Sequence, residues 1–328
     1  MKVCYPVYFH RFHCIAGSCP DSCCKEWDVQ VDACAAKYYR ALPGPLGQRL
    51  RAVMALQEDG SAIMMNENGR CPMWRDDGLC RIQAELGEDA LCQVCREFPR
   101  LTHDYGTFIE YGLELSCPEA AKYILSDLDF KLDSTTLPGD ALPQYDTEAM
   151  DVLLRTREQA IAILRDPRRS IPEALALLLL YGYHAQEELD GAEASDFAPS
   201  IPAIDSEGNA EAICAFFREL EILTPAWQQL LDRPEKGDWT AAHRSLAGYL
   251  VRRYWLQAVS DYDLVCRVKF IVASCLLVRN LGGDVLRTAQ LFSKEIENNA
   301  DNVDAILDGA YCHEALTDIN LLACLAGG

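Results

Sequence analysis

The chain has 328 residues and is 50% hydrophobic, which is enough for two domains with apolar cores. Its net charge of −20 would repel phosphate backbones, so we do not expect nucleic acid as a partner. The longest apolar run, residues 174–181, is far shorter than the roughly 18–20 residues that cross a bilayer. The first residues lack a signal-peptide pattern. We therefore expect no membrane partner and a cytoplasmic location, where thiols stay reduced.

The first 130 residues combine short predicted elements with 11 of the 16 cysteines. Strands are predicted at residues 28–32 and 62–65, with an extended stretch at 107–115. Helices are predicted at 33–42 and 46–57. Such short elements suit a small α+β domain that a bound metal holds together.

The polar segment 131–147 contains two prolines and a glycine, which predicts a linker. Beyond it, helical periodicity predicts an all-α domain over residues 148–328. We expect a loop at 190–208 and helices at residues 150–164, 172–189, 210–223, 240–258, 264–281, 284–298 and 302–325, the last broken near Gly309. The expected fold class is therefore mostly α: a cysteine-rich, metal-bound α+β domain at residues 1–130, followed by a helical domain.

Nine of the ten cysteines between residues 14 and 117 call for a chemical explanation, because free cysteine is usually scarce and buried. The predicted metal ligands are Cys14, Cys19, Cys23, Cys24, Cys71, Cys80, Cys92, Cys95 and Cys117. Cys92-x2-Cys95 and Cys19-x3-Cys23 have the spacing with which one loop supplies two ligands. Nine thiols exceed the four that one zinc ion or one [4Fe–4S] cluster needs. Either two sites exist or some of these cysteines are bystanders.

The spacing leaves zinc and iron–sulfur open. A zinc ribbon would need two CxxC knuckles, and only one is present. The ferredoxin run C-x2-C-x2-C is absent. The CxxxCxxC motif of radical enzymes that use S-adenosylmethionine is also absent, because Glu26 stands at its third position.

Four ordered motifs resemble the flagellin lysine N-methylase family: CIAGSCPDSCCKEWDVQVD, CPMW followed by LCRIQAELG, LCQVCREFPR, and LSCPEAAKYIL. The resemblance is strong over residues 14–125 and weaker over 246–281 and 291–303, where Asn298 stands in place of a histidine that the family often carries. More loosely, the chain is similar to CxxxxCC domains described as zinc- or iron-chelating.

The resemblance implies methyl transfer from S-adenosylmethionine to lysine side chains of flagellin, with a [4Fe–4S] cluster on the N-terminal cysteines and zinc as the alternative. The sequence has no G-x-G-x-x-G turn after a strand, which is the usual nucleotide loop of Rossmann methyltransferases. The cofactor site must therefore be of another kind, and we expect it beside or on the cluster.

A lysine amine has a pKa near 10.4 and must lose a proton before it attacks a methyl carbon. The candidate groups that would assist are Glu119, Glu114, Tyr111, Asp28 and Asp32. The sequence singles out none of them, since a helix cap or a surface position explains each equally well.

Arg96 and Arg100 lie in the CREFPR motif and are the candidate cofactor-binding residues, because a guanidinium binds a carboxylate bidentately. Ion pairs with Glu97 or Glu85 are the simpler explanation. His10, His13 and His103 are weaker candidate ligands, and Trp27 and Phe98 are expected in the core. The remaining cysteines, at 4, 214, 266, 275, 312 and 324, are spread along the chain; Cys266 and Cys275 are expected to be small core residues, and Cys312-His313 is a weak ligand pair.

Three functions compete. The first is a protein-lysine methyltransferase acting on flagellin. The second is a non-catalytic zinc- or iron-chelating protein that senses metal or redox state, and the third is an iron–sulfur electron carrier. The acidic surface could attract a lysine-rich protein substrate, although solubility explains it as well.

Overall fold

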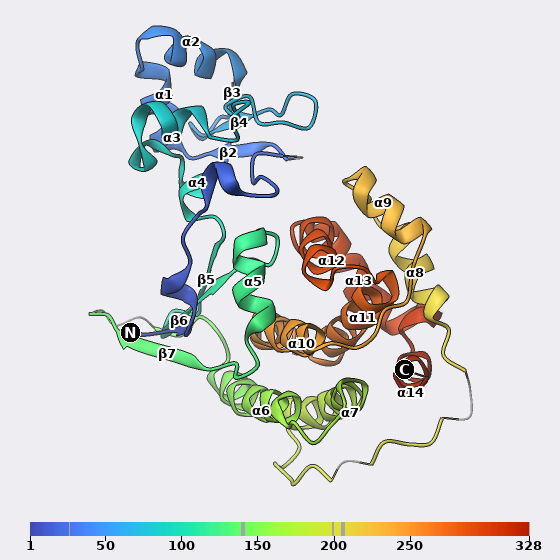
Figure 1. Ribbon diagram of the computed structural model, residues 1–328. Helices are drawn as coiled ribbons and strands as arrows, with labels where there is room; N and C mark the ends of the chain where they lie inside the picture. The colour runs from blue at the N-terminus through green and yellow to red at the C-terminus, as the bar shows by residue number, and fades with distance from the viewer. Residues whose placement is uncertain (26, 139–141, 199, 205–206, 328) are drawn as a thin grey trace. The chain divides into compact units, whose positions relative to one another are not determined.

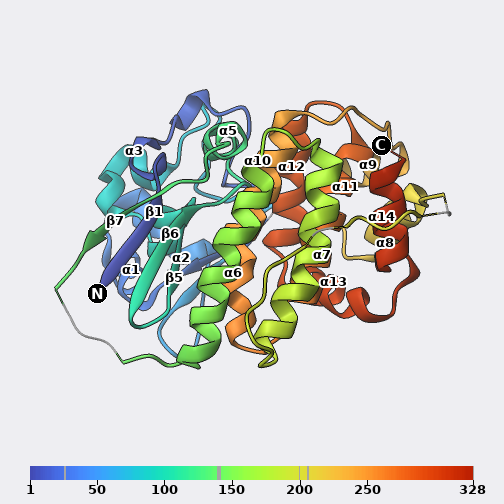
Figure 2. The same cartoon turned by 90° about the horizontal axis from the view of Figure 1, so that it is seen from below.

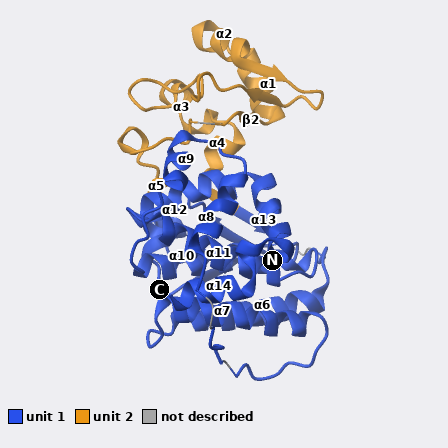
Figure 3. Cartoon of the chain, turned by 90° about the vertical axis from the view of Figure 1, so that its right-hand side faces the viewer, with its two compact units in different colours: residues 1–11, 102–116, 120–328 blue, residues 12–101, 117–119 orange. Residues whose placement is uncertain are grey.

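The computed structural model describes residues 1–25, 27–138, 142–198, 200–204 and 207–327. Its contacts divide the chain into two units (Figure 3). Unit 1 contains residues 1–11, 102–116 and 120–328, and unit 2 contains residues 12–101 and 117–119. Both units are assembled from segments that are not consecutive in the sequence.

Unit 2 is built on a three-stranded antiparallel sheet in the order β2–β4–β3. Its elements are β2 (Val29–Val31), α1 (Ala33–Ala41), α2 (Gly44–Val53), β3 (Met54–Leu56), β4 (Ala62–Met64), α3 (Arg81–Leu86) and α4 (Gln93–Glu97). Asp32 caps α1 by accepting a hydrogen bond from the Ala35 amide. A small core forms around Tyr39, Leu50 and Met73, and Cys71 and Cys92 are part of it.

Unit 1 contains a four-stranded sheet in the order β5–β6–β1–β7 (Figure 1). Its strands are β1 (Lys2–Pro6), β5 (Arg100–Asp104), β6 (Phe108–Leu113) and β7 (Leu132–Thr136), and α5 (Pro118–Ser126) precedes β7. β1 pairs in parallel with β6 and antiparallel with β7. The sheet is joined to the helix α6 (Thr147–Arg165) by a buried ion pair between Arg157 on α6 and Glu110 on β6. Its two N–O distances are 2.6 and 2.7 Å.

The remainder of unit 1 is helical. The helices are α6 (Thr147–Arg165), α7 (Ile171–Leu189), α8 (Ala210–Glu219), α9 (Pro225–Asp232), α10 (Ala241–Tyr254), α11 (Val265–Leu281), α12 (Val285–Phe292), α13 (Ala300–Cys312) and α14 (Asp318–Ala326). A π-helical turn, Ser293–Glu297, follows α12. α11 buries every residue from Cys266 to Leu281, which explains why its sequence shows no polar face. Figure 2 shows α6 and α7 side by side in this bundle.

The predicted mostly-α fold is confirmed, with a small sheet region and a helical C-terminal part. The strands at 28–32 and 62–65 are found, and six of the seven helices predicted after residue 148 are found with shifts at their ends. The seventh, at 302–325, is divided into α13 and α14. The helix predicted at 210–223 stops at Glu219, and α9 starts at Pro225. The predicted break in the last helix is found, but it lies between the end of α13 at Cys312 and the start of α14 at Asp318 and not at Gly309. Gly309 instead gives room to the Phe216 ring, which a Cβ would approach to 2.9 Å.

The segment predicted as a linker contains β7, and its residues 139–141 lie outside the described part of the chain. The predicted division at residues 130 and 147 stays a prediction. Among the described helices, none has the length and apolar character that a membrane span requires.

Candidate metal centre

Unit 2 gathers most of the predicted cysteine ligands on turns and helix starts. Cys80 is the N-cap residue of α3, Cys92 is the N-cap residue of α4, and Cys95 lies inside α4. The Cys71 amide donates a hydrogen bond of 2.8 Å to the Cys24 carbonyl, which joins two segments 47 positions apart. Short elements with fixed turns therefore bring distant thiols together.

Cys24 and Cys71 form the first thiol pair. The Cys24 thiol donates a hydrogen bond to Cys71, and this lowers the pKa of Cys71 to about 7, helped by the backbone amides of Met73 and Trp74. The same pairing with Cys23 and Cys71, together with burial, raises the pKa of Cys24. Cys71 is thus the member of the pair that ionises first, and a thiolate is the form that binds metal.

Cys92 and Cys95 form the second thiol pair. A hydrogen bond from Cys95 lowers the pKa of Cys92, whereas this bond and burial raise the pKa of Cys95. The carboxylate of Asp32 accepts a hydrogen bond of 2.9 Å from the Gln93 amide and so fixes the start of α4. Asp32 therefore supports the geometry of the Cys92–Cys95 pair. Hydrogen bonds from the amides of Ala35 and Gln93 lower the pKa of Asp32.

The two pairs are close enough to influence each other electrostatically. Negative charge on Cys71 raises the pKa of Cys80 and of Cys92, and charge on Cys23 and Cys80 raises the pKa of Cys95. We call this set the thiol cluster: Cys23, Cys24, Cys71, Cys80, Cys92 and Cys95. Thiols whose charges repel one another are the donor set that a cation would stabilise.

The geometry of the thiol cluster is not that of a closed metal site. Within the residues that the structure describes, no group of three or more Cys, His, Asp or Glu side chains is arranged to hold a metal ion. The donor chemistry fits zinc or an iron–sulfur cluster, because both accept thiolates. The contacts join Cys24 to Cys23 and Cys71, and Cys92 to Cys95, so metal binding would require these side chains to move.

The other predicted ligands stand apart from the thiol cluster to different degrees. Cys14 is exposed and accepts a hydrogen bond of 3.4 Å from the Ala16 amide. Burial raises the pKa of Cys19, with smaller contributions from Cys14 and Cys23. Cys117 is buried immediately before α5 and groups with unit 2.

Arg96 lies at a cavity of about 380 Å³ next to the Cys92–Cys95 pair, with Cys34, Tyr38, Leu86 and Asp89 among its other lining residues. Cys34 is exposed and was not among the predicted metal ligands, because its isolated position has no ligand spacing. Arg100 instead places its guanidinium 5.4 Å from the centre of the Phe12 ring. The proposed role of both arginines in binding a cofactor stays a prediction. Glu85 forms an ion pair with Arg81.

Three residues remain candidates for the proton acceptor. Tyr111 packs its ring 5.4 Å from that of Phe9, nearly parallel to it. Glu119 lies in the first turn of α5. Glu114 is half-buried, accepts a hydrogen bond of 3.0 Å from the Ser116 hydroxyl, and has a pKa raised by burial.

The other acidic and histidine candidates have structural partners or lie outside the thiol cluster. Asp28 accepts hydrogen bonds from the amide and the side chain of Asn66. His10 packs edge-on against Tyr5, and His13 is exposed. His103 belongs to unit 1, and burial lowers its pKa.

A buried ionic network in unit 1 was not predicted from the sequence. The Glu297 carboxylate accepts hydrogen bonds from Tyr249 (3.2 Å) and Tyr254 (3.1 Å) and lies 3.2 Å from Arg253 Nε. Charges on Arg253 and Glu297 also act on Glu114. The only signals in the sequence were the tyrosines and arginines of GYLVRRY and the glutamate of SKEIE, which carry no recognised spacing.

Comparison with known proteins gives curated relatives. Over 136 residues, the chain is 32% identical to proteins named lysine-N-methylase from Salmonella typhimurium and Salmonella choleraesuis. It is 31% identical to the flagellar biosynthetic protein FliU of Salmonella muenchen over 136 residues.

Each of these matches covers 38% of the chain. The match covers 77% of FliU but 32% of each lysine-N-methylase, so the chain spans about a third of the length of the latter two proteins. No family model matches the chain, and no solved structure matches it.

Proposed function

Because the chain belongs to the flagellin lysine N-methylase family, we propose that it transfers methyl groups from S-adenosylmethionine to lysine side chains of flagellin. The observation that carries this proposal is the match over 77% of FliU at 31% identity, beside relatives named lysine-N-methylase. Those names combine lysine methylation with flagellar biosynthesis.

The chemistry needs one base. The lysine Nζ lone pair forms a bond to the methyl carbon, the carbon–sulfur bond breaks, and sulfur keeps that electron pair as the thioether of S-adenosylhomocysteine. The proton that leaves Nζ needs an acceptor, and Glu114 suits this role best among the candidates. Burial raises its pKa, so the Glu114 carboxylate takes up a proton more readily than an exposed one.

The thiol cluster is the proposed holder of an iron–sulfur cluster, with zinc as the alternative. Four of its six cysteines would be ligands, and Cys71 and Cys92 are the first to ionise because their pKa values are lowered. A [4Fe–4S] cluster would supply redox-active or Lewis-acidic iron, and zinc would supply structural cross-linking. Asp32 would orient the Cys92–Cys95 pair through the start of α4.

The test is anaerobic purification followed by metal analysis, a visible absorption spectrum with and without S-adenosylmethionine, and mass spectrometry of flagellin after incubation. We expect bound metal and a mass increase of one or more methyl groups on flagellin lysines. A Glu114→Gln variant should retain metal and lose most of the methyl transfer. If flagellin stays unmodified while S-adenosylmethionine binds, the substrate is wrong; if S-adenosylmethionine does not bind, the methyltransferase proposal fails.

The second candidate function is a thiol-based sensor without catalysis. The observation that favours it is the lowered pKa of Cys71 and Cys92, since thiolates are the forms that react with oxidants and metals. A sensor would change its oligomeric state or shape with metal or oxidation and would not respond to S-adenosylmethionine.

A further inference from the structure

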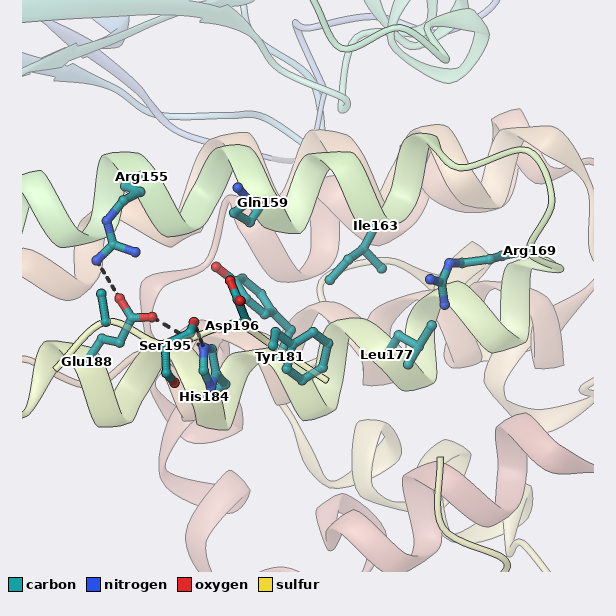
Figure 4. A pocket seen from close by; sticks show the side chains of 12 residues that line it. Arg155, Gln159, Ile163, Arg169, Leu177, Tyr181, His184, Glu188, Ser195 and Asp196 are labelled. Carbon is teal, nitrogen blue, oxygen red and sulfur yellow. Dashed lines mark hydrogen bonds and ion pairs between the residues drawn. The ribbon is translucent and has the colours of Figure 1, made fainter. Parts of the chain in front are cut away.

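Unit 1 contains a cavity of about 900 Å³ between α6 and α7 (Figure 4). Residues 194–197, which follow α7, line it as well. Figure 4 shows Arg155 and Glu188 at one end, Tyr181 near the middle and Arg169 at the other end. Ligand-binding cavities usually have volumes of roughly 300–1,000 Å³, so this one can hold a compound of nucleoside size.

One end of the cavity is formed by a fixed ionic cluster. The Glu188 side chain is only 4% exposed, forms an ion pair with Arg155, and places an oxygen 3.3 Å from His184 Nε2. The same His184 nitrogen lies 3.1 Å from the Ser195 carbonyl oxygen. These contacts anchor the 194–197 segment to α7, so this end of the cavity is preorganised.

The middle of the cavity has an aromatic wall. The Tyr181 ring lies 5.1 Å from the Phe197 ring and 5.8 Å from the His184 ring. Its other side is supported by Trp255, which is nearly parallel to it at 6.2 Å. The Tyr181 side chain is itself buried, so the half-buried Phe197 ring is the part of this wall that a planar base can reach.

Several polar groups at the cavity lack partners among the described residues. They are the two terminal nitrogens of Arg169, the side-chain amide of Gln159, the Tyr181 hydroxyl and the Asp196 carboxylate. Burial raises the pKa of Tyr181 to about 12, so its hydroxyl remains a donor at neutral pH. The cavity thus offers a cation and donors for an acid group, and a carboxylate for hydroxyl groups.

We propose that this cavity is the S-adenosylmethionine site, with Arg169 binding the methionine carboxylate, the Tyr181–Phe197 wall facing adenine, and Asp196 accepting hydrogen bonds from the ribose hydroxyls. This inference rests on the proposed function and deepens it. Guanidinium–carboxylate pairing and an acidic residue on ribose are common features of nucleotide recognition. The site also provides an alternative to the glycine-rich loop that the sequence lacks.

The cavity beside Arg96 is the less suitable of the two. It is smaller, at about 380 Å³. Its second carboxylate, Asp32, is already used by the Ala35 and Gln93 amides. A ligand there would therefore meet fewer unused polar groups.

The test is isothermal titration of the full-length protein with S-adenosylmethionine and with S-adenosylhomocysteine, under anaerobic conditions. Arg169→Gln should weaken both ligands about 10-fold or more, because a charge-assisted pair is lost. Arg168→Gln is the matched control, since Arg168 is the neighbouring arginine and its side chain is 85% exposed. Asp196→Asn, on the exposed 194–197 segment, should weaken the two ligands and adenosine without affecting folding.

The outcomes separate the site from the function. Weaker binding by Arg169→Gln and Asp196→Asn, with Arg168→Gln and Arg96→Gln unchanged, supports the site. Binding by the wild type that is lost only in Arg96→Gln overturns the site and leaves the methyltransferase proposal standing. Absence of binding by the wild type overturns both. Thermal unfolding of each variant shows whether it is folded.

Discussion

Single thiols of unit 2 differ in proton affinity because of the hydrogen bonds that each accepts. Cys71 accepts from Cys24 and from two backbone amides, and Cys92 accepts from Cys95, so these two lose their protons first. Cys266 and Cys275 lie in α11, and burial raises the pKa of both. The pKa values of these thiols therefore differ because of the hydrogen bonds and the burial at each position.

Substitution of the predicted ligands should distinguish these roles. We expect Cys23→Ser and Cys95→Ser, both within the thiol cluster, to lose most of the bound metal and to destabilise unit 2, because a hydroxyl is a poor substitute for a thiolate ligand. Cys19→Ser should do the same if this predicted ligand, which lies outside the thiol cluster, also binds the metal. Cys266→Ser should retain the metal. Metal content per chain after anaerobic purification is the measurement, and full occupancy in both the Cys23 and the Cys95 variant would contradict the thiol cluster as a metal site.

Gly248 makes a close approach that only glycine permits. A Cβ there would lie 2.2 Å from Cε1 of the buried Phe130 ring. Gly248→Ala should therefore reduce the free energy of unfolding by about 1–3 kcal/mol, measured by urea denaturation. Adding Phe130→Leu should recover part of the loss if the clash is the cause. Additive losses in the double variant would show that another effect is responsible.

At the level of elements, the start of α10 depends on a buried histidine. The Thr240 amide donates a hydrogen bond of 3.1 Å to His243 Nδ1, and the His243 side chain is buried. Burial and the positive charge of Arg279 lower the pKa of His243 to about 4. The neutral ring is therefore the form that caps this helix.

This shift predicts a pH dependence of stability. The unfolded chain binds a proton on His243 near pH 6.5 and the folded chain only near pH 4, so this contribution is complete above pH 6.5 and is lost as the pH falls towards 4. Between pH 7.5 and 4.5 the loss should be roughly 2–3 kcal/mol. His243→Gln should show a correspondingly smaller loss in urea denaturation. Equal pH dependence in the two proteins would contradict the assignment, since the titrating carboxylates are common to both.

Elements with strong local signals could be predicted from the sequence, and those set by tertiary contacts could not. Pro172 and the capping residues Ser170 and Glu173 define the start of α7 locally. The π-helical turn Ser293–Glu297 depends on Glu297 reaching its tyrosine and arginine partners on α10. Nothing within residues 293–297 encodes those partners, so the sequence predicted an ordinary helix there.

The candidate site shows the same division. Cysteine spacing predicted nine candidate metal ligands, because ligand spacing is a local property. The pairing of Cys24 with Cys71 and the cavity between α6 and α7 depend on residues far apart in sequence. Figure 3 shows that each unit combines separate segments, which a reading along the chain does not specify. The tertiary arrangement of polar groups was therefore beyond sequence reasoning.

At the level of the whole molecule, the two units should differ in their dependence on metal. Unit 2 has strands of three residues and a small core that includes the thiols of Cys71 and Cys92, whereas unit 1 surrounds the fully packed helix α11. Small domains of this kind gain much of their folding free energy from bound metal, while a large apolar core needs none.

Chelation of the proposed metal under anaerobic conditions should therefore unfold unit 2 and leave the core of unit 1 intact. Hydrogen exchange measured by mass spectrometry resolves the two, because peptides from β4 and α4 should lose their protection while peptides from α11 keep it. Cys266→Ser protein should respond to the chelator as the wild type does. Loss of protection throughout the chain would mean that unit 1 depends on the metal as well. Unchanged protection in unit 2 would mean that its short elements are stable without metal, and the thiol cluster would then be free to act as a reactive rather than a structural site.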